Sequence, residues 1–472
     1  MRLRWKDITS EKRIPNYNKP QSYASLRSEV ESDYYRIITS ASFRRLQDKT
    51  QVFPLDNSDF VRTRLTHSLE VASISKLIGN QVVAKISEKN LEKEKIYVHN
   101  VVETLNCASL LHDIGNPPFG HFGESSIREW YRKNLSRITY NGKAVTTIMT
   151  PQQCLDFYNY EGNAQSLRII SKLHRLKGKH GMHLTSGVMD TIIKYPSNSI
   201  EKVHNDKKEE KSLFHKKVGY YYSETSLFNK IKENTGTKGC RNPLTYMLEA
   251  ADDLAYTFAD LEDGYKKGMY SYDQLLHAIE VSGDVKGKEI LEKNLADAKK
   301  SRSEEDIDFD PYRTAIFNWL TSKQLYSISC VSDAFINHYE EIMNGTFTGE
   351  LIECSSEGKL ISTLKKFAYK NVYLDKSILR VEIMGNEILT FFLKQFTDAL
   401  LHYDSEVYEV NEIQSKYIAL LSGNYLDNYH EETAKLNDEE KVYYRLLLAS
   451  DYIAGMTDGF AKDLYQELKG MK

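Results

Sequence analysis

The chain has 472 residues, and its 63 Lys and Arg against 66 Asp and Glu give a net charge of −3. This balance excludes a globally basic nucleic-acid-binding protein, although it leaves room for local basic patches. The five cysteines are scattered and form no C-x-x-C pair, so neither a disulfide framework nor a zinc ribbon is supported. Neither a secretory leader nor an apolar run of membrane-spanning length is found, so we expect a cytoplasmic protein with reduced thiols and no membrane partner.

Apolar residues recur mostly with the period of an α-helix. The stripes run through residues 71–82, 247–261 and 383–400. Alternation with a period of two is scarce, and residues 217–222 are the best strand-like segment, which predicts one short hairpin element there. The fold class is therefore predicted to be mainly α.

Two stretches carry mixed charges and few apolar residues, namely 197–216 and 296–311. This composition predicts solvated loops or insertions. A soft boundary falls at residues 264–268. We therefore expect a catalytic core over residues 1–265, which hold the chemical motifs, and a helical region over residues 266–472 that completes the core and makes oligomer contacts.

The run from Leu110 to Glu124 contains an adjacent His112 and Asp113. One nitrogen and one oxygen ligand from neighbouring positions suit a divalent ion such as Mn, Fe, Co or Mg better than a thiolate-bound structural zinc. Glycine and two prolines then end the helix that carries the pair. His121 and Glu124 follow, three residues apart on one helical face, and are candidates for proton transfer.

A second histidine, His67, is placed near the first turn of a helix with a clear apolar stripe. By itself it is typical of a core or capping histidine. Together with His112 and Asp113 it becomes a candidate third metal ligand.

A helix over residues 249–260 offers the carboxylate that would complete the set. Asp252, Tyr256 and Asp260 are spaced to share one face, while Asp253 is directed about 100° away. An Asp pair in a helix of Ala, Leu and Phe is costly to bury unless a cation compensates. The alternative interpretation is a capping or surface acidic patch.

Five segments resemble, in order, the bacterial deoxyguanosine triphosphate triphosphohydrolases, a branch of the HD-domain dNTP triphosphohydrolases. They are residues 43–55, 62–71, 112–124, 161–165 and 451–458. Asn116 stands where many HD relatives have a histidine, which favours this branch over the cyclic-nucleotide and signalling HD enzymes. The similarity covers residues 20–265 and returns at 440–465.

The resemblance implies an all-α HD-type core with an extended helical C-terminal half. It also implies hydrolysis of dNTPs, preferentially dGTP, to a deoxynucleoside and intact triphosphate, with one divalent metal per site, Mn or Mg being favoured over Fe or Co. The implied acid–base pair beside the α-phosphate is His121 and Glu124. The implied metal ligands are His67, His112, Asp113 and Asp252.

The resemblance also assigns substrate contacts. Arg64, Lys194 and Tyr195 would contact phosphates, together with Lys217 or its neighbour Lys216. The remaining three residues would surround the sugar: Tyr256 stacking under the deoxyribose, and Gln51 and Asp260 near its 3′-hydroxyl. A triphosphate carries several negative charges, and these basic residues would neutralise part of that charge.

Partners and alternatives follow from the same comparison. A homo-oligomer is expected, with a hexamer favoured. The basic stretch 168–179 and clusters of tyrosines are compatible with single-stranded DNA. The alternative functions are a broad-specificity dNTP triphosphohydrolase, another HD nucleotide phosphohydrolase and, third, a non-enzymatic single-stranded nucleic-acid-binding protein.

Overall fold

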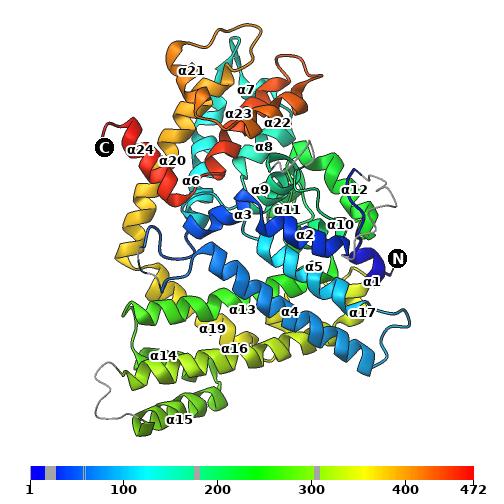
Figure 1. Ribbon diagram of the computed structural model, residues 1–472, viewed down its shortest axis with the longest axis vertical. Helices are drawn as coiled ribbons and strands as arrows, with labels where there is room; N and C mark the ends of the chain where they lie inside the picture. Colours follow the sequence, from blue (N-terminus) through cyan, green and yellow to red (C-terminus); the bar gives the residue numbers. More distant parts are fainter. Residues whose placement is uncertain are drawn as a thin grey trace.

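The computed structural model describes residues 2–15, 28–56, 58, 60–174, 181–301 and 309–471. It is dominated by helices (Figure 1), which confirms the predicted fold class. Within these ranges the one sheet is a two-stranded hairpin of β1 (Thr139–Tyr140) and β2 (Lys143–Ala144).

The hairpin predicted at residues 217–222 is wrong, because the segment from Lys217 to Tyr221 forms no strand. Gly219 N donates to the Ser197 carbonyl at 2.8 Å, a single contact that does not extend into a ladder. The apolar side chains of this segment, Val218, Tyr220 and Tyr221, are all buried. Burial in an irregular loop therefore produced the pattern that resembles a strand.

The stretches predicted as loops are partly helical. Residues 197–216 contain α11 (Ser199–Asp206), which Asn198 and Glu201 begin with a reciprocal capping box. The first part of 296–311 continues α15 (Val285–Ser301), whereas residues 302–308 lie outside the described ranges. In α11, the capping box stabilises a helix in a segment whose polar composition had predicted a loop.

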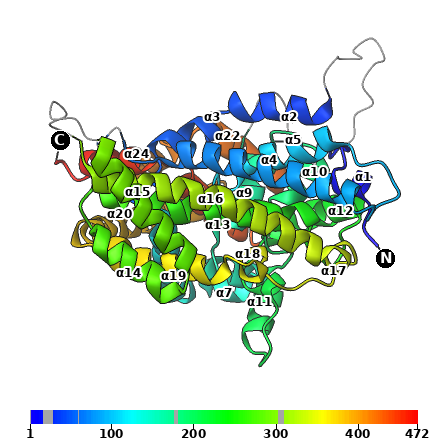
Figure 2. The ribbon, with the colours of Figure 1, turned by 90° about the horizontal axis from the view of Figure 1, so that it is seen from below.

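Four helices lie side by side in the lower half of Figure 1: α4 (Arg64–Glu88), α5 (Val98–Leu111), α13 (Pro243–Lys266) and α16 (Pro311–Asn337). Thr63 caps α4: its side chain accepts from Thr66 N, and the Thr66 side chain accepts from Thr63 N. From below (Figure 2), α15 packs along α16, while α14 (Tyr272–Ser282) packs on α15 and on α19 (Gly358–Ala368), which in turn contacts α13.

The C-terminal half packs directly on the segment that follows α5. The long helix α20 (Lys376–Leu401) contacts α6 (Gly120–Asn134), α23 (Lys441–Ala454) and α24 (Asp458–Leu468). Phe119, buried with a positive φ of 62°, lies against Gly385 of α20, where a Cβ would come within 2.7 Å of its ring. One apolar cluster therefore includes residues from both halves, and the division at 265 and 266 stays a prediction.

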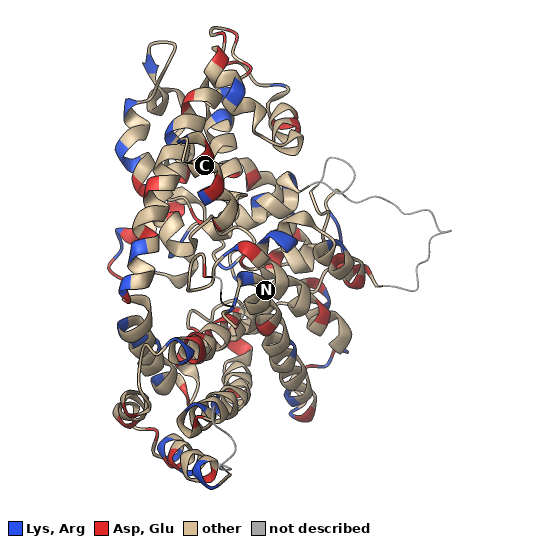
Figure 3. Ribbon diagram, turned by 60° about the vertical axis from the view of Figure 1, so that its left-hand side comes forward, with Lys and Arg blue, Asp and Glu red and all other residues tan. Residues whose placement is uncertain are grey.

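The charges of both signs are interspersed along the helices (Figure 3). In the part of the chain that the structure describes, no helix is both long enough and apolar enough to cross a membrane.

Candidate active site

The turn after α5 presents His112 and Asp113. His112 is the C-cap residue of the helix, and its Nδ1 lies 2.7 Å from the Ser109 carbonyl, a bond in which the ring nitrogen donates. Asn116 Nδ2 donates to Asp113 Oδ1 at 2.5 Å, and Arg64 forms an ion pair with the other oxygen of Asp113. The bond to Ser109 keeps a proton on His112 Nδ1 and leaves Nε2 to face the site.

Two further elements bring His67 and Asp252 to the same place. Asp252, on α13, has its Oδ1 at 3.0 Å from His67 Nε2 of α4 and 3.5 Å from His112 Nε2. One ligand atom each from His67, His112 and Asp113 lies within 4.8 Å of the others. All four predicted ligands therefore meet, although they are supplied by three separate segments.

This cluster fits a divalent cation. His112 Nε2 is buried and has no hydrogen-bond partner among the described residues, while two carboxylates face it. Burial by itself would lower the pKa of His112, yet Asp113 and Asp252 raise it to about 9. The site therefore demands positive charge, and nitrogen and oxygen donors are what a borderline or hard metal ion takes. These residues would hold a divalent metal ion.

His121 and Glu124 lie on the first turns of α6. His121 Nδ1 is 3.4 Å from Glu124 Oε2, and the buried Glu124 accepts a bond from Gly162 N at 2.7 Å through its other oxygen. A Cβ on Gly162 would lie 2.5 Å from Glu124 Oε1, so this contact needs glycine. The hydrogen bond and charge of Glu124 raise the pKa of His121, which favours its protonated form.

One cavity of about 540 Å³ connects these groups. The predicted ligands and acid–base residues line it except His67 and Glu124, which are buried behind Asp252 and His121. The predicted substrate-binding residues that line the same cavity are Gln51, Arg64, Lys194, Tyr195, Lys217, Tyr256 and Asp260.

The predicted phosphate-binding cations have carboxylate partners. Lys217 Nζ lies 2.9 Å from Glu161 Oε1, and Lys194 Nζ lies 3.5 Å from Glu249 Oε1. Burial would lower the pKa of both lysines, but these carboxylates raise it, so both ammonium groups stay charged. Lys217 lines the active-site cavity, whereas Lys216 lines a neighbouring one.

The predicted sugar-binding residues gather at another part of the wall. Tyr373 donates to Asp260, and burial raises the pKa of that carboxyl to about 7 in spite of this bond. Gln51 Oε1 is buried without a hydrogen-bond partner among the described residues. Lys365 Nζ pairs with Asp253 at 2.9 Å and lies 5.1 Å from the centre of the Tyr256 ring.

Sequence reasoning missed the residues that support or complete the cavity. Glu161 and Glu249 stand in segments that had been singled out, although neither was given a role, and Tyr373 carried no signal. Asp458 of the C-terminal motif accepts from Thr50 N at 3.0 Å and Phe119 N at 2.9 Å, which joins two walls of the cavity. These two hydrogen bonds give a structural role to the last of the five family-like segments, residues 451–458.

The basic stretch 168–179, which was considered for binding single-stranded DNA, begins with a buried arginine. Arg168 is 2% exposed and is bound by three carboxylates, so it offers no surface charge to a nucleic acid. Its partners are Glu224, Glu432 and Asp451. Residues 175–180 lie outside the described ranges.

Two family models match the chain: the HD domain at residues 64–144 and the phosphohydrolase-associated domain at residues 356–467. They place the chain among the HD-domain phosphohydrolases. It is also similar over 99% of its length to the whole of three deoxyguanosinetriphosphate triphosphohydrolase-like proteins, from Listeria monocytogenes (45% identical), Listeria innocua (44%) and Synechocystis (32%). The chain belongs to this deoxyguanosinetriphosphate triphosphohydrolase-like family.

Proposed function

We propose that the protein hydrolyses deoxynucleoside triphosphates, preferentially dGTP, to a deoxynucleoside and intact triphosphate. The observation that carries this proposal is the shared cavity, in which a metal-binding cluster and the His121–Glu124 pair meet cations and a sugar-sized polar wall. The preference for dGTP is supported by the names of the relatives.

Charge stabilisation and positioning dominate phosphoryl chemistry of this kind. A divalent cation at the cluster would neutralise phosphate charge and polarise the phosphorus centre. Arg64, Lys194 and Lys217 would orient the triphosphate from their places in the cavity wall. We favour Mn or Mg as the ion.

His121 would deliver the proton that the leaving 5′-oxygen needs. Its ring is 77% exposed yet lines the cavity, so it can reach substrate, while the buried Glu124 orients it through Nδ1. Glu124 remains ionised: burial would raise its pKa, but the bond to His121 lowers it to about 2. His121 therefore presents Nε2 as the donor.

The sugar would be read by shape and by hydrogen bonds. Tyr256 offers an aromatic face on which a 2′-hydroxyl would clash. Asp260 and Gln51 Oε1 supply acceptors for the 3′-hydroxyl, and Gln51 Oε1 has no competing partner among the described residues. A buried acceptor left unpaired is costly, so a matching hydroxyl gains affinity and specificity.

Product analysis tests this proposal. Purified protein is incubated with Mn²⁺ and each of the four dNTPs, with GTP as the control, and nucleoside and tripolyphosphate are resolved. Deoxynucleoside with intact triphosphate, formed fastest from dGTP, is the expected result. Equal rates with all four dNTPs would replace the dGTP preference by broad specificity. Monophosphate with pyrophosphate, or no product at all, would reject the proposal.

A further inference from the structure

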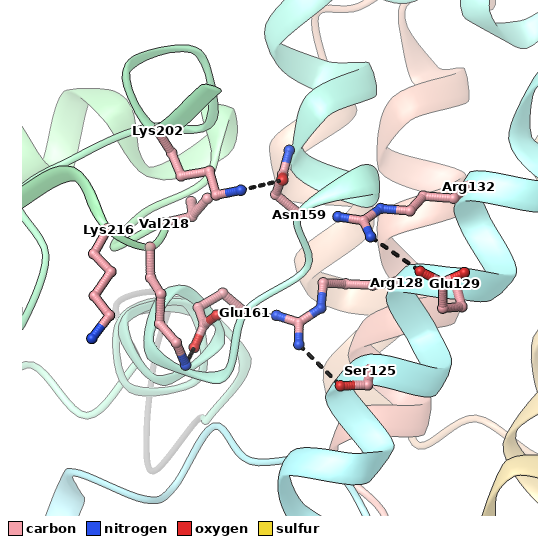
Figure 4. Close-up of a pocket in the computed structure, with 10 residues that line it drawn as sticks. Ser125, Arg128, Glu129, Arg132, Asn159, Glu161, Lys202, Lys216 and Val218 are labelled. Atoms are coloured by element: carbon pink, nitrogen blue, oxygen red, sulfur yellow. Dashed lines mark hydrogen bonds and ion pairs between the residues drawn. The ribbon is translucent and has the colours of Figure 1, made fainter. Parts of the chain in front are cut away.

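A second cavity, of about 320 Å³ (Figure 4), shares Lys217 with the active-site cavity. Arg128 and Arg132 of α6 line one side, and Lys202 and Lys216 line the other. Lys217 contributes a fifth cation, against the carboxylates of Glu129 and Glu161. Among its lining residues the cavity therefore has an excess of positive charge, unlike the chain as a whole.

Several of these cations are held in place by the fold. Arg132 Nε donates to the Tyr158 carbonyl at 3.0 Å, and Lys202 Nζ donates to Asn159 Oδ1 at 3.1 Å. The ammonium group of Lys216 has no hydrogen bond or ion pair among the described residues. Arg132 and Lys202 also form ion pairs, with Glu129 at 3.0 Å and with Asp206 at 2.7 Å. Cations held on opposite sides of a cavity attract a multivalent anion.

Glu161 lines the second cavity and is hydrogen-bonded to Lys217, which lines both cavities. It is 2% exposed and accepts from Lys217 at 2.9 Å, Asn163 at 2.9 Å and Arg128 at 3.3 Å. Asn163 and Lys217 line the active-site cavity, whereas Arg128 lines the second one. An anion bound to Arg128 and Lys217 would compete with Glu161 for both cations, and this competition couples the two cavities.

We propose that the second cavity is a binding site for a linear polyphosphate chain, with inorganic triphosphate as its ligand. The polyphosphate chemistry follows from the cations, and the choice of triphosphate rests on the proposed function, which releases that product next to this cavity. The volume lies at the small end of ligand pockets and suits an anion without a nucleoside. The triphosphate group of a second nucleotide is the other source of the same chemistry.

The test uses the full chain and sodium tripolyphosphate in EDTA, followed by titration calorimetry. R132Q/K202Q removes one cation from each side of the cavity, and K238Q/K416Q removes two exposed lysines elsewhere as a charge-matched control. We expect R132Q/K202Q to lose one bound tripolyphosphate per chain, or to bind it about tenfold more weakly. The control should match the unmodified protein.

Equal stoichiometry and affinity in R132Q/K202Q and the unmodified protein would overturn the proposal. dGTP added in EDTA identifies the source: displacement as effective as that by tripolyphosphate assigns the cavity to a second nucleotide, and weak displacement assigns it to the free product. Hydrolysis by the unmodified protein is measured separately. A protein that releases no triphosphate but loses the anion in R132Q/K202Q would contradict the proposed function and keep the polyphosphate site.

A kinetic readout separates a binding site from a structural role. R132Q/K202Q should keep kcat while tripolyphosphate inhibits it less, because only the second cavity has changed. Inhibition that is unaltered in R132Q/K202Q would also argue against the site.

Discussion

The proposed metal-binding end and the proposed phosphate-binding end of the cavity differ in how their charged side chains are paired. At the metal end, His67, His112 and Asp252 contact one another directly, and Asp113 is held by Arg64. At the phosphate end, each cation is paired with a carboxylate from a different part of the chain, Lys217 with Glu161 and Lys194 with Glu249. The first arrangement places two carboxylates where a cation could bind. The second holds two lysine ammonium groups in ion pairs that an anion could replace.

The two ends should therefore differ in how they tolerate substitution. The carboxylates at the phosphate end prevent buried ammonium groups from being unpaired, which would be costly. In the proposed function a triphosphate would replace these carboxylates as the partner of the lysines, whereas nothing would replace a lost metal ligand. Variants at the metal end should therefore be the more damaging.

The largest effect is expected from Asp113→Asn. The substitution keeps the shape but removes a charged ligand, so metal binding should be lost and kcat/KM should fall roughly 10³-fold or more. Metal content of the purified variant and tripolyphosphate release check this expectation. Retained activity without bound metal would remove the metal site from the mechanism.

His121→Ala should keep the metal and lose rate, by roughly 10²-fold or more, because it removes the proton donor and no predicted ligand. His277→Ala is the matched control: His277 is also 77% exposed and has Glu280 three residues later, but it lies outside the cavity. Metal analysis with kcat for both variants provides the measurement. Equal rates in the two variants would contradict the assignment of His121.

Tyr256→Ala should weaken discrimination against ribonucleotides. Opening the space under the sugar should bring the kcat/KM values for dGTP and GTP closer by about tenfold. The two rate constants are compared in one preparation of the variant. An unchanged ratio would place the sugar elsewhere in the cavity.

Glu124→Gln should shift the pH profile. Because Glu124 raises the pKa of His121, its removal lowers that pKa, and the protonated donor is lost at a lower pH. The alkaline limb of kcat should move down by about one pH unit, while the acid side is affected less. A limb that stays in place would mean that another group titrates.

The smallest effect is expected from Glu161→Gln at the phosphate end. It removes a competitor for Lys217, so KM for the dNTP should fall about threefold at low salt with little change in kcat. The decrease should vanish at high ionic strength. A raised KM would show that Glu161 is needed to position Lys217.

The sequence by itself predicted the helical class, which the structure confirms, and it supplied the proposed metal ligands and acid–base pair. Helical periodicity and the His112-Asp113 run are local, and His121 and Glu124 lie on one helical turn, so neighbouring positions suffice to place them. Asp252, Tyr256 and Asp260 were predicted to share a face for the same reason, and all three line the cavity.

Only the tertiary structure decided which distant groups complete the cavity. Tyr373 reaches Asp260 from the segment before α20, and Glu249 and Glu161 reach the lysines from separate elements. The predicted hairpin failed for a related reason, since burial of Val218 and Tyr220 in a loop imitates the alternation of a strand. Pairing between distant charges leaves no periodic mark on the chain, because it depends on how the helices pack.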